Sequence, residues 1–162
     1  MIEQIVNFVP LSDDLWCAGM PTEDQMRDVA RRGAEAVINL ATPDSDRALE
    51  DEAALVHSLG MEYASIPVDW DAPTGHDLQK FCDAMERHEG KKILVHCQAN
   101  YRATAFIALY RVRRLGWHPA RALESVRQVW DPDQYPTWKR FIEDQMNEGP
   151  GNQSRGQPTP RR

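Results

Sequence analysis

The chain lacks the features that define several large classes of protein. Its three cysteines, Cys17, Cys82 and Cys97, are too few and too uneven in number for a disulfide framework, and an odd count suits a reducing compartment. No apolar run approaches the roughly 18 residues needed to cross a bilayer. The first residues, MIEQIVNFVPLSDD, have neither the basic start nor the apolar core of a signal peptide. These absences make a cytoplasmic location the expectation.

Positive charge is also scarce. Lys and Arg number 19 against 25 Asp and Glu, which gives a formal net charge of −6. Because phosphate backbones and anionic membranes attract basic surfaces, we expect no nucleic-acid partner and no membrane partner. The five histidines show no metal-ligand spacing, so no metal is expected.

The composition that is present fits one globular domain. Hydrophobic residues make up 41% and charged residues 27% of the 162 positions, which is ordinary for a soluble domain with a core of its own. From Glu148 onward Gly, Pro, Gln and Arg dominate without apolar periodicity. We therefore predict a folded domain over 1–147 and a disordered tail over 148–162.

Short apolar segments alternate with amphipathic ones along the domain. Repeated strand–helix units predict an α/β fold with a mostly parallel central sheet and helices on both faces. The helix after Cys97 is apolar nearly all round and is predicted to be the buried central helix. The predicted strands are 15–18, 36–40, 63–68 and 93–95, and the predicted helices are 23–32, 49–59, about 78–85, 103–115, 119–130 and 137–147.

The segment 91–104, KKILVHCQANYRAT, carries the strongest chemical signal. A buried strand would deliver Cys97 to a turn at the start of a helix, where unpaired N–H groups and the helix dipole favour a thiolate and bind an oxyanion. The alternative is a buried core cysteine, which is the interpretation we give to Cys17 and Cys82. The sequence therefore places a nucleophile and an anion-binding loop together at the carboxyl end of a strand.

The run HCQANYRAT resembles the signature of cysteine-dependent protein tyrosine and dual-specificity phosphatases. His96 and Cys97 stand in the family's places, Asn100 stands where the family has glycine, and Thr104 keeps a Ser or Thr position. Arg102 comes one residue early, so the loop reads Cys-x4-Arg, as in a subgroup of bacterial phosphatase-like proteins. The segments AVINLAT and GMEYASIPVDWDAPT follow the family's order, and the resemblance covers roughly residues 15–141.

This resemblance implies a dual-specificity-phosphatase-like fold and hydrolysis of phosphate monoesters through a cysteinyl-phosphate on Cys97, with no cofactor. Arg102 would hold two phosphate oxygens with its planar fork. The expected partner is a phosphorylated protein or a small phosphate monoester, with phosphotyrosine, phosphoserine, lipid and nucleotide phosphates all open. The sequence carries no signal of the oligomeric state. The residues assigned to phosphate binding are Gln98, Ala99, Asn100, Tyr101, Arg102 and Ala103.

The mechanism also needs a proton donor for the leaving oxygen. Asp69 lies four residues before Pro73, as the acid does in several dual-specificity cell-cycle phosphatases, so it is our first choice and Asp71 the second. The alternative is that either aspartate only forms a turn or caps a helix. Weaker candidates are Asp131 and Asp133.

Two further residues of the motif have supporting roles. His96 is interpreted as a hydrogen-bonding residue that orients the loop. The hydroxyl of Thr104 is expected to hydrogen-bond the sulfur of Cys97.

Two other functions remain open on the sequence. Rhodanese-class sulfurtransferases use a six-residue loop that begins with Cys and often ends with Arg, and CQANYR has that length. A Cys97 persulfide would then transfer sulfur. The third possibility is a non-catalytic phosphate-binding module. A plausible acid at Asp69 favours the phosphatase, because neither alternative needs one.

Overall fold

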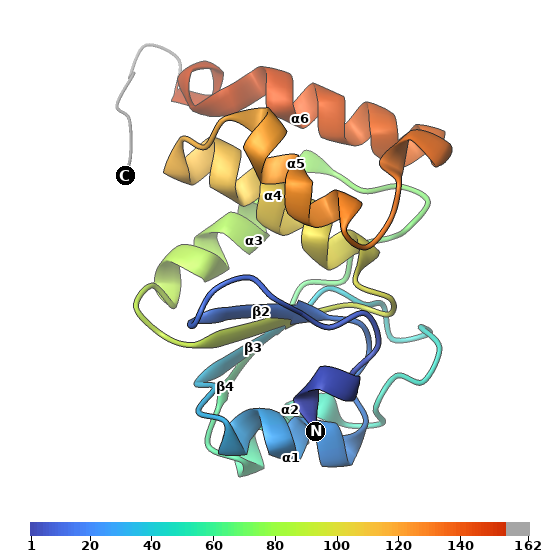
Figure 1. The fold of residues 1–162 in the computed structure, drawn as a ribbon, viewed down its shortest axis with the longest axis vertical. Helices are drawn as coiled ribbons and strands as arrows, with labels where there is room; N and C mark the ends of the chain where they lie inside the picture. Colours follow the sequence, from blue (N-terminus) through green and yellow to red (C-terminus); the bar gives the residue numbers. More distant parts are fainter. Residues whose placement is uncertain (155–162) are drawn as a thin grey trace.

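The computed structural model describes residues 1–154, with side chains described as far as Glu148. Its core is a five-stranded sheet in the order β1-β2-β5-β3-β4 (Figure 1). All neighbours are parallel except β1 and β2, which are antiparallel. The strands are β1 (Val9–Pro10), β2 (Leu15–Ala18), β3 (Ala36–Asn39), β4 (Glu62–Ser65) and β5 (Ile93–His96).

The central strand β5 is the one that leads to Cys97. All four of its residues are buried, as expected for a parallel strand covered on both faces. His96 pairs with Ala18 of β2 and with Asn39 of β3, and Asn39 pairs in turn with Ser65 of β4. The carboxyl ends of the four parallel strands therefore meet at one edge of the sheet.

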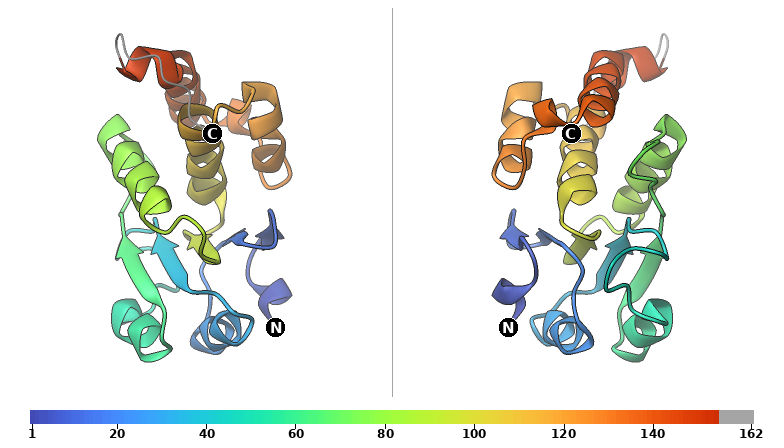
Figure 2. Two further views of the ribbon diagram at one scale, coloured as in Figure 1. Left: turned by 90° about the vertical axis from the view of Figure 1, so that its left-hand side faces the viewer. Right: turned by 90° about the vertical axis from the view of Figure 1, so that its right-hand side faces the viewer.

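Helices cover both faces of the sheet (Figure 2). One hydrophobic core joins the short N-terminal segment to α1 and α2, and a larger core joins the other face to α3, α4, α5 and α6. The predicted fold class, a mostly parallel α/β sheet between helical layers, is confirmed. The helices are α1 (Glu23–Arg31), α2 (Glu52–Ser58), α3 (Gly75–Arg87), α4 (Tyr101–Leu115), α5 (Pro119–Arg127) and α6 (Pro136–Ser154).

Helix α4 is the centre of the larger layer, as its composition predicted. Every residue from Arg102 to Val112 is buried, because α3, α5 and α6 all pack around this helix. Gly116 ends it in the left-handed conformation, with φ of 76°, which glycine adopts without the steric cost of a Cβ atom. None of the helices described for this chain is long and apolar enough to span a membrane.

Several element boundaries differ from those predicted. Helix α2 begins at Glu52, three residues later than expected, because the Asp51 side chain accepts a hydrogen bond from the N–H of Ala54 and caps it. Strand β4 ends at Ser65, three residues earlier than expected, although the N–H groups of Ile66 and Val68 still donate to the carbonyl oxygens of Asn39 and Leu40. The sequence interpretation also omitted the short strand β1 and two 3₁₀ turns, η1 (Ile2–Gln4) and η2 (Pro132–Gln134).

The C-terminal helix is longer than expected. Helix α6 continues past Asn147 to Ser154, so the first seven residues of the predicted disordered tail are described as helix. Residues 155–162 lie outside the described part of the chain, and disorder there stays a prediction.

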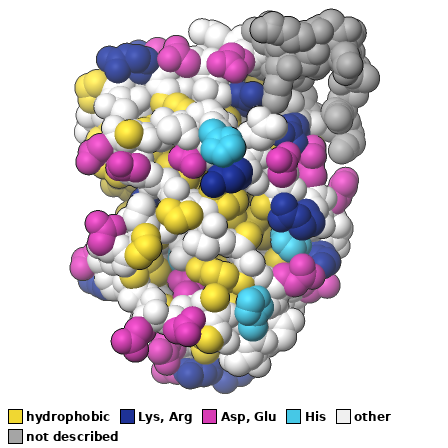
Figure 3. Space-filling view, turned by 180° about the vertical axis from the view of Figure 1, so that it is seen from behind, with side chains coloured by type: hydrophobic (Ala, Val, Ile, Leu, Met, Phe, Trp, Pro, Cys, Tyr) yellow, Lys and Arg dark blue, Asp and Glu magenta, His cyan; other side chains and the backbone are white. Residues whose placement is uncertain are grey.

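The face that carries α3 and β4 lies behind the view of Figure 1 and is shown in Figure 3. Small hydrophobic patches on this face are separated by acidic, basic and histidine side chains. Glu62 on the edge strand β4 is exposed and forms an ion pair with Lys91. Charges on an edge strand discourage pairing with a strand of another chain.

Candidate functional site

The thiol of Cys97 lies where β5 ends and α4 is about to begin. Cys97 is fully buried by its neighbours yet forms part of the wall of a cleft of about 440 Å³. The position at a strand-to-helix turn agrees with the sequence interpretation. The other residues that line this cleft are Trp70, Gln98, Ala99, Tyr101, Arg102 and Tyr135.

The carbonyl groups at the start of the loop are bound on the side away from the cleft. The carbonyl oxygen of Cys97 lies 3.1 Å from Nδ1 of His96. The carbonyl oxygen of Gln98 accepts a hydrogen bond of 2.9 Å from the N–H of Met20. In a trans peptide the N–H points opposite to the C=O. The N–H groups of Gln98 and Ala99, two residues that line the cleft, therefore point away from these partners.

The second half of the loop is held in the same way. The carbonyl oxygen of Ala99 accepts a hydrogen bond of 2.9 Å from the side-chain amide of Asn7. The first N–H groups of α4, those of Tyr101 and Arg102, have no acceptor within the helix. The positive end of the helix dipole is added to these donors. This set of N–H donors, with the Cys97 thiol beside it, is suited to binding an anion.

Asn100 takes the left-handed conformation, with φ of 70°, at the N-cap of α4. Asparagine is one of the few residues besides glycine that adopt it readily, which explains how it fills the family's glycine position. Asn100 and Ala103 are both fully buried and are not among the residues that line the cleft. Their assignment to phosphate binding stays a prediction, whereas Gln98, Ala99, Tyr101 and Arg102 do line it.

Arg102 is the second residue of α4 and is only 6% exposed. Its Nη1 donates a hydrogen bond of 2.9 Å to the carbonyl oxygen of Val68, which fixes the plane of the guanidinium. Arg102 also lines a second cleft of about 370 Å³ beside the first, together with Asp69 and Asp71. The arginine therefore lies between the thiol and the predicted acids.

Asp69 and Asp71 both reach the second cleft, which shares Trp70, Gln98 and Arg102 with the first. One oxygen of Asp69 accepts a hydrogen bond of 2.9 Å from the N–H of Asp71. This oxygen of Asp69 therefore forms a turn, as the alternative interpretation of the aspartate expected. The second carboxylate oxygen of Asp69 does not take part in that hydrogen bond.

The other two acids belong to a different turn. Asp131 forms an ion pair with Arg127 and accepts a hydrogen bond from the N–H of Asp133. Neither Asp131 nor Asp133 is among the residues that line the two clefts.

His96 forms a buried pair that the sequence interpretation missed. Its Nε2 lies 2.6 Å from Oε2 of Glu52, and the two side chains are 0% and 5% exposed. Its other nitrogen, Nδ1, faces the carbonyl oxygen of Cys97. Glu52 is one turn before the buried Val56 on α2. A carboxylate in line with an apolar helix face was the available signal.

Thr104 does not contact the sulfur in the way the sequence predicted. Its hydroxyl lies 2.8 Å from the carbonyl oxygen of Asn100 and 3.0 Å from that of Tyr101, both of which accept. The same oxygen accepts a hydrogen bond of 2.9 Å from Nε1 of Trp130. A hydroxyl has one proton, and here that proton is directed at the helix carbonyls. Thr104 therefore stabilises the start of α4 and holds the Trp130 side chain through its hydroxyl oxygen.

Aromatic rings form one wall of the main cleft, which the sequence interpretation also missed. Tyr101 and Trp130 are stacked, with ring centroids 4.8 Å apart and an interplanar angle of 7°. Trp70 packs against both of them and against Tyr135. Burial, followed by the nearby Tyr135, raises the pKa of Tyr101, so its hydroxyl stays neutral near pH 7. The wall is therefore apolar and uncharged.

The other two cysteines have the buried environments assigned to them from sequence. Burial raises the pKa of Cys17 and that of Cys82 to about 12, so both remain thiols at neutral pH. No group of three or more His, Cys, Asp or Glu side chains suited to a metal ion occurs among the described residues.

Comparison with known proteins places this chain in a family. The sequence model described as "DSP-PTPase phosphatase fused to NAD+ Kinase" matches residues 9–142. The chain is 32% identical over 111 residues to the "Beta-lactamase hydrolase-like protein" of Xylella fastidiosa, a match that covers 66% of this chain and 25% of that protein. The chain thus spans about a quarter of the curated relatives that it matches.

Solved structures agree. A DUF442 protein from Shewanella putrefaciens CN-32 has a TM-score of 0.83 and 35% identity, with 91% of this chain and 95% of that chain covered. A mutant form of Tk-PTP has a TM-score of 0.74 and 22% identity, with 91% and 97% covered; at that identity the likeness shows the fold alone. From the match over residues 9–142, the chain belongs to the dual-specificity-type (DSP-PTPase) phosphatase family.

Proposed function

We propose that this chain hydrolyses phosphate monoesters through a cysteinyl-phosphate intermediate on Cys97. The observation that carries the proposal is the loop itself. Its carbonyl groups are bound by donors outside the cleft, which leaves N–H groups and Arg102 to face an anion beside the thiol. Such an arrangement stabilises the negative charge of a transferring phosphoryl group.

The proposed reaction has two displacements. The Cys97 thiolate attacks phosphorus, the bond between phosphorus and the leaving oxygen breaks, and Asp69 gives its proton to that oxygen. Water then attacks the phosphorus, Asp69 takes a proton from it, and the thiolate leaves. The loop and Arg102 hold the phosphoryl oxygens throughout. The sum is an ester plus water giving an alcohol plus phosphate.

The aromatic residues that line the cleft favour a leaving group with an aromatic ring. Trp70, Tyr101 and Tyr135 line the cleft beside Cys97, and aromatic rings attract other rings edge-to-face or offset-stacked. A phosphotyrosine-like substrate, in a protein or a small ester, is therefore the substrate we propose, ahead of phosphoserine, lipid and nucleotide phosphates.

The test compares two cysteine variants. Cys97→Ser should abolish hydrolysis of an aryl phosphate, whereas Cys82→Ser, which changes a buried thiol on α3, should keep most of it. Vanadate, which mimics the pentavalent transition state, should inhibit the wild type. Full activity of Cys97→Ser would rule out the thiolate mechanism.

Sulfur transfer is the second candidate, and the six-residue length of the loop favours it. A sulfurtransferase would gain one sulfur atom on Cys97 from thiosulfate, measurable by mass spectrometry, and would pass it to cyanide. That result without phosphatase activity would replace our proposal. Phosphate binding without either activity would indicate a non-catalytic module.

A further inference from the structure

We propose that Asn7 is a positioning residue that holds the Cys97–Arg102 loop in its anion-binding conformation. Asn7 is 90 residues before Cys97 in the sequence and is not among the residues that line the main cleft. The expected effect on catalysis rests on the proposed function. The restraint of the loop by Asn7 is argued from hydrogen bonds alone.

Two asparagine side chains bind each other's segments. The amide of Asn7 donates a hydrogen bond of 2.9 Å to the carbonyl oxygen of Ala99. The amide of Asn100 donates one of 2.7 Å to the carbonyl oxygen of Asn7. Asn100 also lies 3.5 Å from the sulfur of Cys17 on β2. The middle of the loop is thereby tied to the N-terminal segment in both directions.

The backbone at Asn7 is shaped for this contact. Asn7 has a φ of 50°, in the left-handed region that costs most residues energy. Glycine would adopt the same conformation, but it has no side chain to reach Ala99. Asparagine combines tolerance of this φ with a side-chain N–H donor, which is what the bond to Ala99 requires.

The backbone at Gly19 packs tightly between the N-terminal segment and the Cys97–Arg102 loop. The N–H of Gly19 donates to the carbonyl oxygen of Val6 over 2.6 Å. A Cβ atom at Gly19 would lie 2.5 Å from the carbonyl oxygen of Gln98, so a side chain at this position would displace the loop. The N-terminal segment and the β2–α1 connection therefore back the loop directly.

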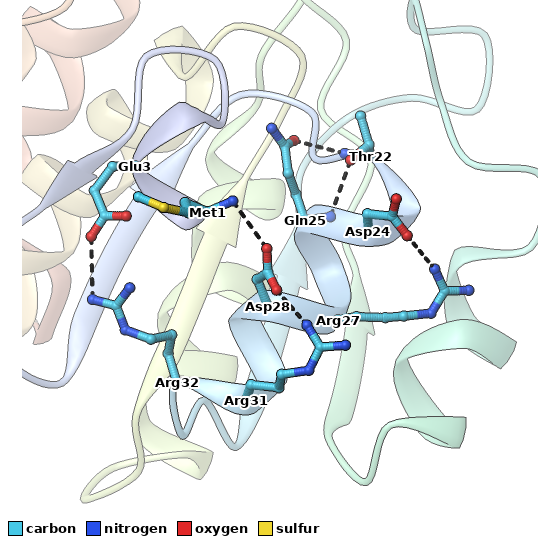
Figure 4. A network of polar contacts seen from close by, with 9 residues as sticks. All are labelled: Met1, Glu3, Thr22, Asp24, Gln25, Arg27, Asp28, Arg31 and Arg32. Atoms are coloured by element: carbon cyan, nitrogen blue, oxygen red, sulfur yellow. Dashed lines mark hydrogen bonds and ion pairs between the residues drawn. The ribbon is translucent and has the colours of Figure 1, made fainter.

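The segment that carries Asn7 is itself anchored at several points. Ile2 and Ile5 are buried in the core between the sheet and α1. At the surface, Glu3 forms an ion pair with Arg32, and the Met1 amino group forms one with Asp28 on α1 (Figure 4). Asn7 thus extends from a fixed support, and its bond restrains the loop.

Loss of the Asn7 amide would free the Ala99 carbonyl. The peptide between Ala99 and Asn100 would then rotate more easily, and the N–H groups beside it would no longer be held toward the anion. One such bond contributes about 1 kcal/mol, so the equilibrium constant between the correctly oriented loop and its other conformations should fall by about fivefold.

The experiment uses two variants and a matched control in the whole chain. Asn7→Gly keeps the backbone conformation and removes the donor. Asn7→Asp keeps the shape and puts an oxygen against the Ala99 carbonyl. Gln4→Ala removes an exposed amide from the same segment. Hydrogen exchange of the amides of 98–101 is measured with saturating inorganic phosphate, which would give these N–H groups an acceptor. Binding of inorganic phosphate and kcat for an aryl phosphate are also measured for each variant, with urea unfolding as the measure of global stability.

Both Asn7 variants should exchange the loop amides about fivefold faster and bind phosphate more weakly than the wild type. Their kcat should fall more than KM changes, while Gln4→Ala behaves as wild type. Exchange equal to wild type in Asn7→Gly would overturn the proposal. So would faster exchange spread evenly over the chain, because that indicates a global loss of stability. If the wild type has no phosphatase activity but the loop amides still respond, the proposed function fails and the positioning role stands.

Discussion

The buried pair of His96 and Glu52 limits where protons can be. Both nitrogens of His96 face oxygen atoms, one from the Glu52 carboxylate and one from the Cys97 carbonyl. Two such bonds need a proton on each ring nitrogen, or one proton on the ring and one on the carboxyl. Either arrangement has no net charge. The pair therefore holds His96 rigidly beneath the loop. Removing either partner would leave the other as a buried polar side chain without its hydrogen bond.

This pair gives the first prediction. Glu52→Ala should lower the free energy of unfolding by about 3–5 kcal/mol, because breaking a buried pair strands the remaining partner. Urea unfolding at pH 7 measures the loss. Glu50→Ala, at an exposed position two residues earlier, is the control and should change little. Equal stabilities of the two variants would show that His96 needs no partner.

Residues of the loop could be predicted from sequence, whereas their supports could not. Cys97 and Arg102 have a fixed offset beside a buried strand, and that local pattern has a direct chemical meaning. Glu52 and Asn7 contact the loop only because β3–α2 and the N-terminal segment are brought to it by the fold. Contacts 44 and 92 residues apart in sequence leave no local periodicity to detect.

Among the elements, the connection from β4 to α3 is the one most directly joined to the site. It carries Asp69, and the residues on each side of Asp69 are both fixed through their carbonyl oxygens. Val68 accepts from Arg102 over 2.9 Å, and Trp70 accepts from Nε1 of Trp138 over 2.7 Å. Helix α6 therefore helps to set the position of Asp69, the proposed acid, from outside the cleft.

The second prediction uses this anchor. Trp138→Phe keeps an aromatic side chain, although a smaller one, and removes the donor to Trp70. The loop that carries Asp69 should therefore shift, and proton donation should become less efficient. Hydrolysis of phenyl phosphate should slow more than that of an activated nitrophenyl ester, as it should in Asp69→Asn, where general-acid loss costs about 10²–10⁴-fold. Steady-state kinetics with both esters measure the effect.

The control is Asp71→Asn, which should slow both esters only slightly. If Asp71→Asn shows the leaving-group dependence and Asp69→Asn does not, Asp71 is the acid. If Trp138→Phe slows both esters equally, α6 acts on something other than the acid.

Element boundaries were predictable where the signal was local. Thr22 and Gln25 form the capping box that begins α1, and the apolar α4 is buried as predicted. Strand β1 has two residues at the sheet edge, too short for an alternating pattern to appear. Strand β4 ends at Ser65, although Ile66 and Val68 still donate to backbone carbonyls in and just after β3. Such continuation beyond a strand depends on its neighbour and not on its own sequence.

At the scale of the whole molecule, the parallel sheet has the cleft at one end and a buried histidine, His88, at the other. The cleft lies where the strands end, and His88 lies at the opposite end, after α3 and near the start of β4. His88 is 3% exposed, and burial lowers its pKa, an effect that Lys91 and Arg87 reinforce and Glu62 opposes. Its Nδ1 lies 3.7 Å from Glu62 without a hydrogen bond. His88 is therefore buried in its neutral form.

The third prediction follows from this burial. An unfolded histidine titrates near pH 6.5, whereas the folded state resists protonation of His88. As the pH falls through about 6.5, the unfolded state takes up a proton that the folded state does not, so the free energy of unfolding falls. Above that pH the contribution is constant. His88→Leu should consequently lose less stability than the wild type between about pH 7.5 and 5.5, measured by urea unfolding at each pH. His76→Gln, which changes an exposed histidine on α3, should retain the wild-type slope. A His88→Leu slope equal to that of the wild type would mean that His88 takes up a proton as readily in the folded protein as in the unfolded one.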